Sequence, residues 1–116
     1  MLRLPASVRT YLCREPTDMR RSFDRLALMA QELIHQDPLS GHVFVFRNRK
    51  GDRVKLLHWD QDGFVIWYKR LEKGVFHWPE GVFADGRLER RELAMMLEGM
   101  KVVQVSKRSR YQKNNM

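Results

Sequence analysis

The chain has 116 residues, which is enough for one compact domain with a hydrophobic core and leaves little room for a second domain. An apolar fraction of 43%, with three Trp and six Phe, excludes an intrinsically disordered chain, and a single cysteine excludes an intrachain disulfide. No apolar run is long enough for a signal peptide or a membrane-spanning helix, so we expect a cytoplasmic protein.

Positive charge is the first feature that points to a partner. The chain carries 22 Lys and Arg against 14 Asp and Glu, which gives a formal net charge of +8 at pH 7. Such a surface attracts polyanions, because cations that neutralise phosphates release condensed counterions. The charge favours a nucleic acid and leaves open an acidic protein partner or a surplus that only keeps the protein soluble.

A strand and a long helix are expected in the first third of the chain. Residues Val8 to Cys13 alternate as a strand does, Thr17 then stands where an N-cap would, and Asp18 suits a helix amino terminus. One apolar face follows at helical spacing: Phe23, Leu26, Ala27, Ala30, Leu33 and Ile34. The opposite face carries Arg20, Arg21, Asp24, Arg25 and Glu32. Pro38 and Gly41 end the helix.

The middle third predicts an antiparallel meander. Its strands are expected at His42–Arg47, Arg53–Trp59, Phe64–Arg70 and Val75–Trp78. The segments between them are about four residues long and rich in Asn, Asp and Gly, as hairpin connections are.

The last third predicts a short helix and a basic tail. Arg90 to Glu98 has an apolar side and is closed by Gly99, and Val102 to Val105 could add a brief strand. We therefore predict an α+β fold in a single domain, residues 1–105, followed by a flexible basic tail, residues 106–116. The predicted architecture is a curled antiparallel meander of four or more strands packed against one long helix, plus a short C-terminal helix.

The strands around the first two turns are unusually basic. Within nine positions lie Arg47, Arg49, Lys50, Arg53 and Lys55. Strand periodicity places Arg53, Lys55 and Trp59 on one face, and it places Val65, Trp67 and Lys69 together on the neighbouring strand. If the register aligns these two sets, cations interleave with indole rings on a surface that could hold phosphates and stack bases. The alternative is a solvated outer face on which the Trp rings pack under Lys and Arg stems.

No catalytic constellation is predicted. Asp52, Asp60 and Asp62 occupy turn positions, which is a sufficient reason for their being acidic, and the four His match no metal-ligand spacing. Cys13 has no identifiable base, which favours a small apolar filler over a nucleophile. We predict no catalytic residue, no metal and no cofactor.

Several long stretches of the sequence resemble the sequence motifs of one protein family. They include Asp18–Asp24, Ser40–Arg49, Gly51–Leu57, Trp67–Gly74 and Phe76–Pro79. In this order they closely resemble the TnpB accessory protein of insertion sequence 66 type elements, the product of the second open reading frame, over nearly the whole chain. One departure is Arg90-Arg91, which stands in place of a polar helix start and is expected to weaken the cap of the second helix.

The resemblance implies a bacterial accessory protein of DNA transposition, with the DDE-type transposase on a separate chain and no established binding residues to carry over. Combined with the charge, it predicts a non-catalytic protein that binds DNA, nonspecifically or at element ends, to assist that transposase. The expected DNA-contacting residues are Arg47, Arg49, Lys50, Arg53, Lys55, Lys69, Arg70, Lys73, Lys107, Arg108 and Arg110, with Trp59 and Trp67 as candidate surface aromatics. The alternative is a protein-interaction module that binds the transposase or another element-encoded protein without contacting DNA.

Overall fold

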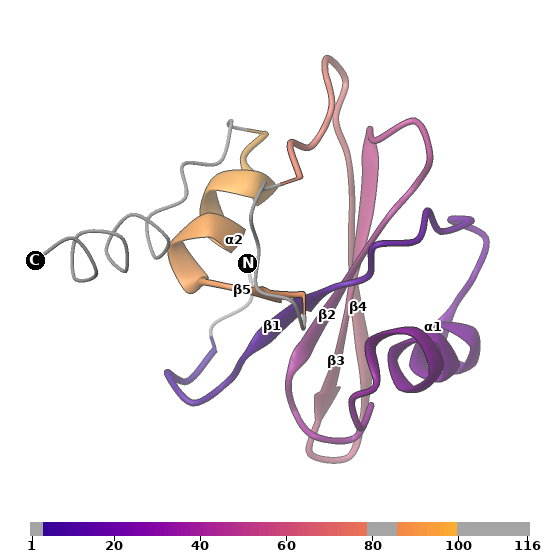
Figure 1. Ribbon diagram of the computed structural model, residues 1–116, viewed down its shortest axis with the longest axis vertical. Helices are drawn as coiled ribbons and strands as arrows, with labels where there is room; N and C mark the ends of the chain where they lie inside the picture. The colour runs from indigo at the N-terminus through magenta and orange to yellow at the C-terminus, as the bar shows by residue number, and fades with distance from the viewer. Residues whose placement is uncertain (1–3, 79–85, 100–116) are drawn as a thin grey trace, which may run out of the picture.

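The computed structural model describes residues 4–78 and 86–99, and within them five strands form one sheet (Figure 1). The strands are β1 (Thr10–Leu12), β2 (Val43–Arg47), β3 (Arg53–Asp60), β4 (Gly63–Arg70) and β5 (Arg87–Leu88). Their order across the sheet is β4-β3-β2-β1-β5. The predicted α+β class is confirmed, as is the antiparallel pairing of β2, β3 and β4.

The sheet is mixed, so the expected purely antiparallel meander is wrong at β1. This strand pairs parallel with β2, with Tyr11 opposite Phe44, and antiparallel with β5. Parallel neighbours need a crossover connection, and the helix that follows β1 supplies it.

The crossover helix is shorter than predicted and starts later. Helix α1 (Phe23–Met29) continues as the π-helical turn η1 (Ala30–Ile34), and its N-cap is Ser22. Thr17 is not the cap, because it is buried and its backbone N–H donates to the Arg47 carbonyl at 2.9 Å. The predicted apolar face is also only partly buried: Leu26, Ala30 and Ile34 are in the core, whereas Phe23 and Leu33 are 44% and 47% exposed.

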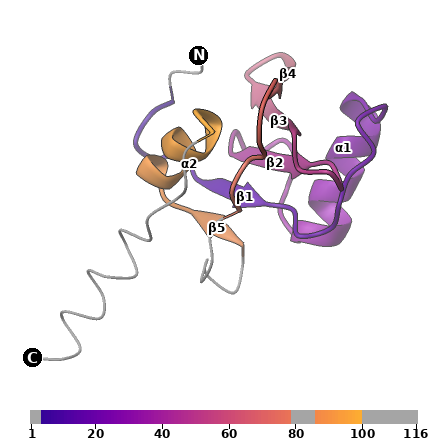
Figure 2. The same ribbon diagram turned by 90° about the horizontal axis from the view of Figure 1, so that it is seen from above.

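Helices cover both faces of the sheet, as Figure 2 shows with α1 and α2 on opposite sides. On the α1 face, Leu26 and Ile34 pack with strand residues such as Phe44, Phe46 and Leu57. On the other face, α2 (Arg90–Leu97) packs its apolar side on the strands: Leu93, Met96 and Leu97 join Val43, Val45, Val54 and Leu56. The expectation of a single covering helix is therefore wrong.

Residues 75–78 do not form the predicted fourth strand of the meander. Phe76 is fully buried in the α2-face core, and its backbone N–H donates to the Gly51 carbonyl at 2.8 Å. The segment is thus held by an inserted side chain and by contacts with the β2–β3 turn instead of by a strand ladder.

Helix α2 confirms the predicted second helix and corrects the weak cap expected at Arg90-Arg91. A capping box joins Glu89 and Glu92, with the Glu89 N–H donating to the Glu92 carboxylate at 3.1 Å. Gly99, at φ +75°, follows the helix end as predicted. The expected strand at 102–105 and the tail at 106–116 lie outside the described residues.

Candidate nucleic-acid interface

Three cation-rich segments meet at one end of the sheet, and we call them together the basic end: residues 47–55 and 69–73, whose turns are at the top of Figure 1, and residues 14–21, which run to the right below them. They hold eleven Lys and Arg against four Asp and Glu. Arg53 pairs with Arg70 across β3 and β4, and the Leu71 N–H donates to the Asp52 carbonyl at 2.8 Å. The bond from the Thr17 N–H to the Arg47 carbonyl attaches the first segment. Tertiary structure therefore concentrates charge that is scattered in the sequence.

The β2–β3 turn at the centre of this end is braced by Asn48. The Asn48 Oδ1 atom accepts from the N–H groups of Gly51 and Arg53, both at 3.0 Å, and its Nδ2 donates to Asp52 at 2.8 Å. This last bond is the main reason why the pKa of Asp52 lies below its usual value, with nearby Lys50 adding to it. The bracing holds the backbone still while the next side chains, Arg49 and Lys50, project into solvent.

Four of the predicted contact residues are exposed at the basic end: Arg49, Lys50, Arg70 and Lys73. Lys50 lies 3.9 Å from Asp52, and Arg70 lies 3.1 Å from Glu72. Both ion pairs are solvent-exposed on the cation side, so each holds its cation only weakly. These side chains can exchange their carboxylate partners for phosphates at little cost.

Three other predicted contact residues are engaged within the fold. Arg47 donates from Nη1 to the Phe76 carbonyl at 2.9 Å and lies over the Trp78 ring at 4.4 Å, and burial lowers its pKa. Lys55 is buried, and its Nζ donates to the Arg21 carbonyl at 2.7 Å. The Lys69 Nζ atom donates to the Leu97 carbonyl at 2.6 Å, at the end of α2.

The expected alternation of cations and indole rings on one face is wrong. The β3–β4 turn pairs Asp60 with Gly63, so each odd-numbered residue of β3 lies opposite an even-numbered residue of β4. Trp67 and Lys69 consequently lie on the α2 face, whereas Arg53, Lys55 and Trp59 lie on the α1 face. Trp59 packs edge-on against Phe64 at 5.0 Å, and Trp67 packs against the α2-face core.

Tyr68 takes the place that a tryptophan was expected to fill. It pairs with Lys55 across the strands, its hydroxyl lies 3.3 Å from Nη1 of Arg53, and the Lys55 Nζ lies 4.9 Å from its ring. With 47% of its surface exposed, it presents an aromatic ring beside cations. The sequence contained the signal, because a two-residue turn at Gln61-Asp62 fixes the register that brings Tyr68 beside Lys55.

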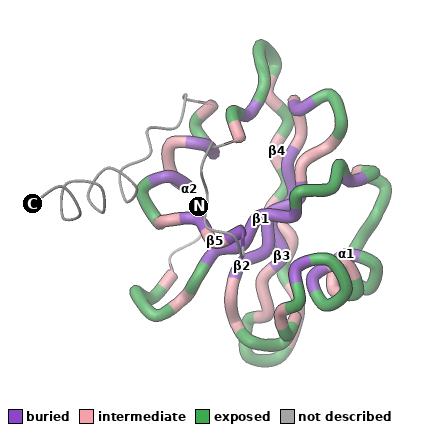
Figure 3. The backbone as a smooth tube through the Cα atoms, in the orientation of Figure 1, coloured by how far each residue is buried: buried purple, intermediate pink, exposed green. Residues whose placement is uncertain are grey.

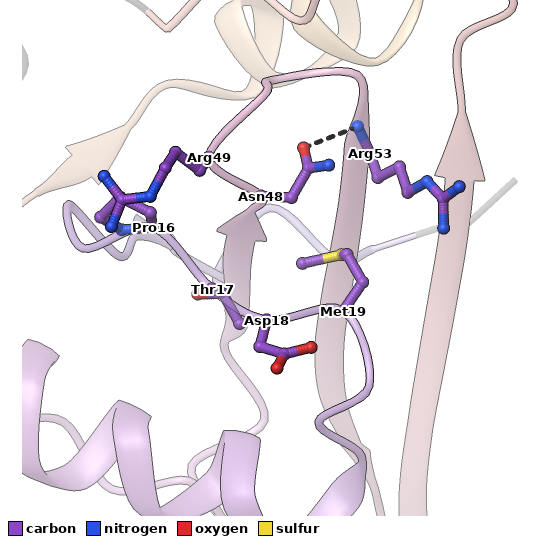
Figure 4. Close-up of a pocket in the computed structure, with 7 residues that line it drawn as sticks. All are labelled: Pro16, Thr17, Asp18, Met19, Asn48, Arg49 and Arg53. Carbon is purple, nitrogen blue, oxygen red and sulfur yellow. Dashed lines mark hydrogen bonds between the residues drawn. The ribbon is translucent and has the colours of Figure 1, made fainter.

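The loop before α1 adds two cations that the sequence placed on the helix, Arg20 and Arg21. Asp18 holds Arg20 through two-pronged contacts, the shorter at 2.6 Å, and this hydrogen bonding lowers the pKa of Asp18. Asp18 also lines a groove between this loop and the β2–β3 turn, shown in Figure 4. There the side chains of Arg49 and Arg53 point away from each other on opposite sides, so the groove is an open, mixed-charge surface.

The described residues contain no group of three or more His, Cys, Asp or Glu side chains that could hold a metal ion. Cys13 is buried in the α1-face core, and burial raises the pKa of its thiol, which disfavours the reactive thiolate. Lys107, Arg108 and Arg110 lie outside the described residues.

The fold and this surface define a small α+β protein with one basic end and a sheet covered on both faces. The chain belongs to the family described as IS66 Orf2 like protein, which matches residues 8–107 and confirms the resemblance. The family associates the protein with transposition by IS66 elements. Neither helix of the described residues has the length and apolar character needed to cross a membrane.

Two relatives come from Sinorhizobium fredii (strain NBRC 101917 / NGR234). The uncharacterized protein y4hO is 36% identical over 100 residues, which cover 86% of this chain and 87% of the relative. The uncharacterized protein y4jC is 29% identical over 103 residues, which cover 87% of this chain and 86% of the relative. No solved structure matches the chain.

Proposed function

We propose that this protein is a non-catalytic accessory of DNA transposition that contacts the DNA backbone through the exposed cations of the basic end. The observation that carries the proposal is the clustering of Arg49, Lys50, Arg70 and Lys73 around a braced turn. Backbone phosphates are the polyanion that such a cluster fits, since Lys and Arg contacts to phosphate supply most sequence-independent affinity.

The distribution of charge along the sheet supports the same proposal. Residues 35–46 and 56–68, which form the opposite end of β2, β3 and β4, contain no Lys or Arg and include Asp37, Asp60 and Asp62. A surplus serving solubility alone would have no reason to leave these stretches of the strands without cations, although Arg9 lies beside His42. The separation is what orients a protein on a polyanion.

The test is a fluorescence-anisotropy titration of the purified chain against labelled element-end and unrelated duplexes over a salt series. Contacts to roughly six phosphates give a log–log salt slope of about −5. Similar affinities for the two duplexes would identify phosphate contacts, and preference for the element end would add base readout. Absence of binding at low salt would overturn the proposal.

A second candidate is a protein-interaction module for the transposase, and one observation favours it. Phe23, Leu28 and Leu33 of α1 and η1 are each more than 40% exposed, although the helix has a buried face available. Exposed aromatic and aliphatic side chains are typical anchors of protein interfaces. Co-purification of the element's proteins after nuclease treatment separates the two functions, because complexes bridged by DNA are lost and direct protein contacts survive.

A further inference from the structure

Strand β4 forms an open edge of the sheet. It pairs with β3 on one side, and no other described strand lies on its outer side. Figure 2 shows it at one border of the sheet, with the helices on the two faces. An edge strand presents unpaired N–H and C=O groups that another strand can join.

This edge lacks the usual protection against strand addition. Over its eight residues β4 pairs with β3 one for one from Gly63 to Arg70, so it has no bulge, and it contains no Pro. Its only charges are at the last two positions, and Lys69 is bound to the Leu97 carbonyl. Val65 and Tyr68 are instead 39% and 47% exposed.

Charge along β4 changes sign from one end to the other. The strand starts beside Asp60 and Asp62 of the β3–β4 turn and finishes with Arg70 at the basic end. In an antiparallel pair of identical β4 strands, the acidic turn of each copy would lie beside the basic end of the other. The two contacts would be identical by symmetry. A second copy of the chain therefore places opposite charges beside both ends of the β4 edge.

We propose that β4 is a self-association surface, at which two copies pair antiparallel about a two-fold axis and continue one sheet through both. A register centred on Ile66 sets Arg70 opposite Asp62 of the second copy and Tyr68 opposite its Phe64. Arg70 must exchange its exposed contact with Glu72, which costs little. The inference goes beyond DNA binding and does not depend on it, although it shares Arg70 with the proposed DNA contacts.

The first experiment is sedimentation equilibrium of the full chain, freed of nucleic acid by nuclease and a high-salt wash, from micromolar to millimolar concentrations. The expected result is a reversible dimer that weakens as salt is added. V65K places a charge on the edge and should weaken the dimer by about tenfold or more. L33K makes the same change at a residue that is 47% exposed and lies beside Leu12 of β1, three strand positions away from β4, and should leave the dimer unchanged.

Charge reversal tests the antiparallel alignment and also serves if V65K fails to fold. R70E and D62K should each weaken the dimer, because each places like charges at both symmetric contacts, and the double variant R70E/D62K should restore it. Failure of the double variant to recover would overturn the alignment. A chain that sediments as a monomer throughout, or a dimer indifferent to V65K and to both reversals, would overturn the proposal.

Discussion

The two ends of the β3–β4 hairpin are built from the same two strands and differ in almost every other respect. At the basic end, Asn48 braces a turn from which Arg49 and Lys50 project. At the other end, the two-residue turn Gln61-Asp62 is acidic, and Gln61 adopts φ 58°. The acidic turn is exposed from Asp60 to Asp62, whereas in the β2–β3 turn Arg49 and Lys50 are exposed and Gly51 is buried (Figure 3).

The length of the hairpin makes this difference matter electrostatically. Eight residues of strand extend about 25 Å, which exceeds the Debye length of about 8 Å at physiological salt. Each end therefore presents its own electrostatic potential to solvent, because salt screens it from the charges of the other end. A small sheet can therefore hold two surfaces of opposite charge without either neutralising the other.

The largest expected effect comes from discharging the basic end alone. R49A/K50A should weaken DNA binding roughly 10- to 100-fold at moderate salt and make the salt slope shallower by about 2, because two phosphate contacts are lost. Anisotropy titrations measure both quantities.

The matched control is R25A/R91A, which removes two exposed cations from outside the basic end. An equal loss of affinity in this control would show that net charge, and not its location, drives binding.

Replacing a glycine by alanine should also change the free energy of unfolding by different amounts in the two turns. Gly51 has φ +87°, and an added Cβ would lie 3.3 Å from the Val75 Cβ, so G51A should lower the free energy of unfolding by about 2 kcal/mol. G63A, at the acidic end, meets nothing within 4 Å and should change it by less than about 0.5 kcal/mol. Urea denaturation compares them, and equal costs would refute the assigned turn geometry.

Within the basic end, replacing a cation that is hydrogen-bonded inside the fold should reduce stability, whereas replacing an exposed cation should reduce DNA affinity. K55M removes the bond to the Arg21 carbonyl and should cost about 1 kcal/mol of stability, with DNA affinity nearly unchanged. K50M should do the reverse, because its side chain is 80% exposed. Denaturation and anisotropy on both variants measure this, and a loss of affinity confined to K55M would contradict the assignment.

The smallest expected effect is a pH dependence carried by Asp52. The folded state lowers the pKa of Asp52, so its ionised form adds stability above the unfolded value of about 4, and this contribution is lost as pH falls through the folded value. The stability difference between the wild type and D52N should therefore shrink below about pH 4. Denaturation at pH 6 and pH 3 tests this, and a constant difference would argue against the Asn48–Asp52 bond.

Local patterns in the sequence determined much of the fold. The strands β2, β3 and β4 and the helix α2 follow from alternation, helical spacing and turn residues, and those signals act over a few neighbouring residues. The concentration of cations around the β2–β3 turn is likewise visible along the chain. The family resemblance, carried by long ordered motifs, is confirmed by the match to residues 8–107.

Long-range contacts decided the rest. Thr17 has the chemistry of a helix cap, but its backbone N–H donates to the Arg47 carbonyl. The helix therefore begins later, at Phe23, with Ser22 as its N-cap. Residues 75–78 have strand-forming side chains, yet Phe76 enters the core and its backbone bonds to Gly51. In both cases a partner distant in sequence satisfies the backbone, and local propensity does not contain that information.

The candidate interface divides in the same way. Alternation within one strand correctly grouped Arg53 with Lys55 and Trp67 with Lys69, because period two is a local property. The relation between the strands depends on the hairpin register, and there a shift of one residue exchanges the faces. The sequence by itself thus determined which residues carry charge and where they cluster along the chain. Only the tertiary structure decided which cations donate hydrogen bonds to the carbonyls of Phe76, Arg21 and Leu97 and which remain exposed. The reason is that these acceptors are distant in sequence from the cations that they bind.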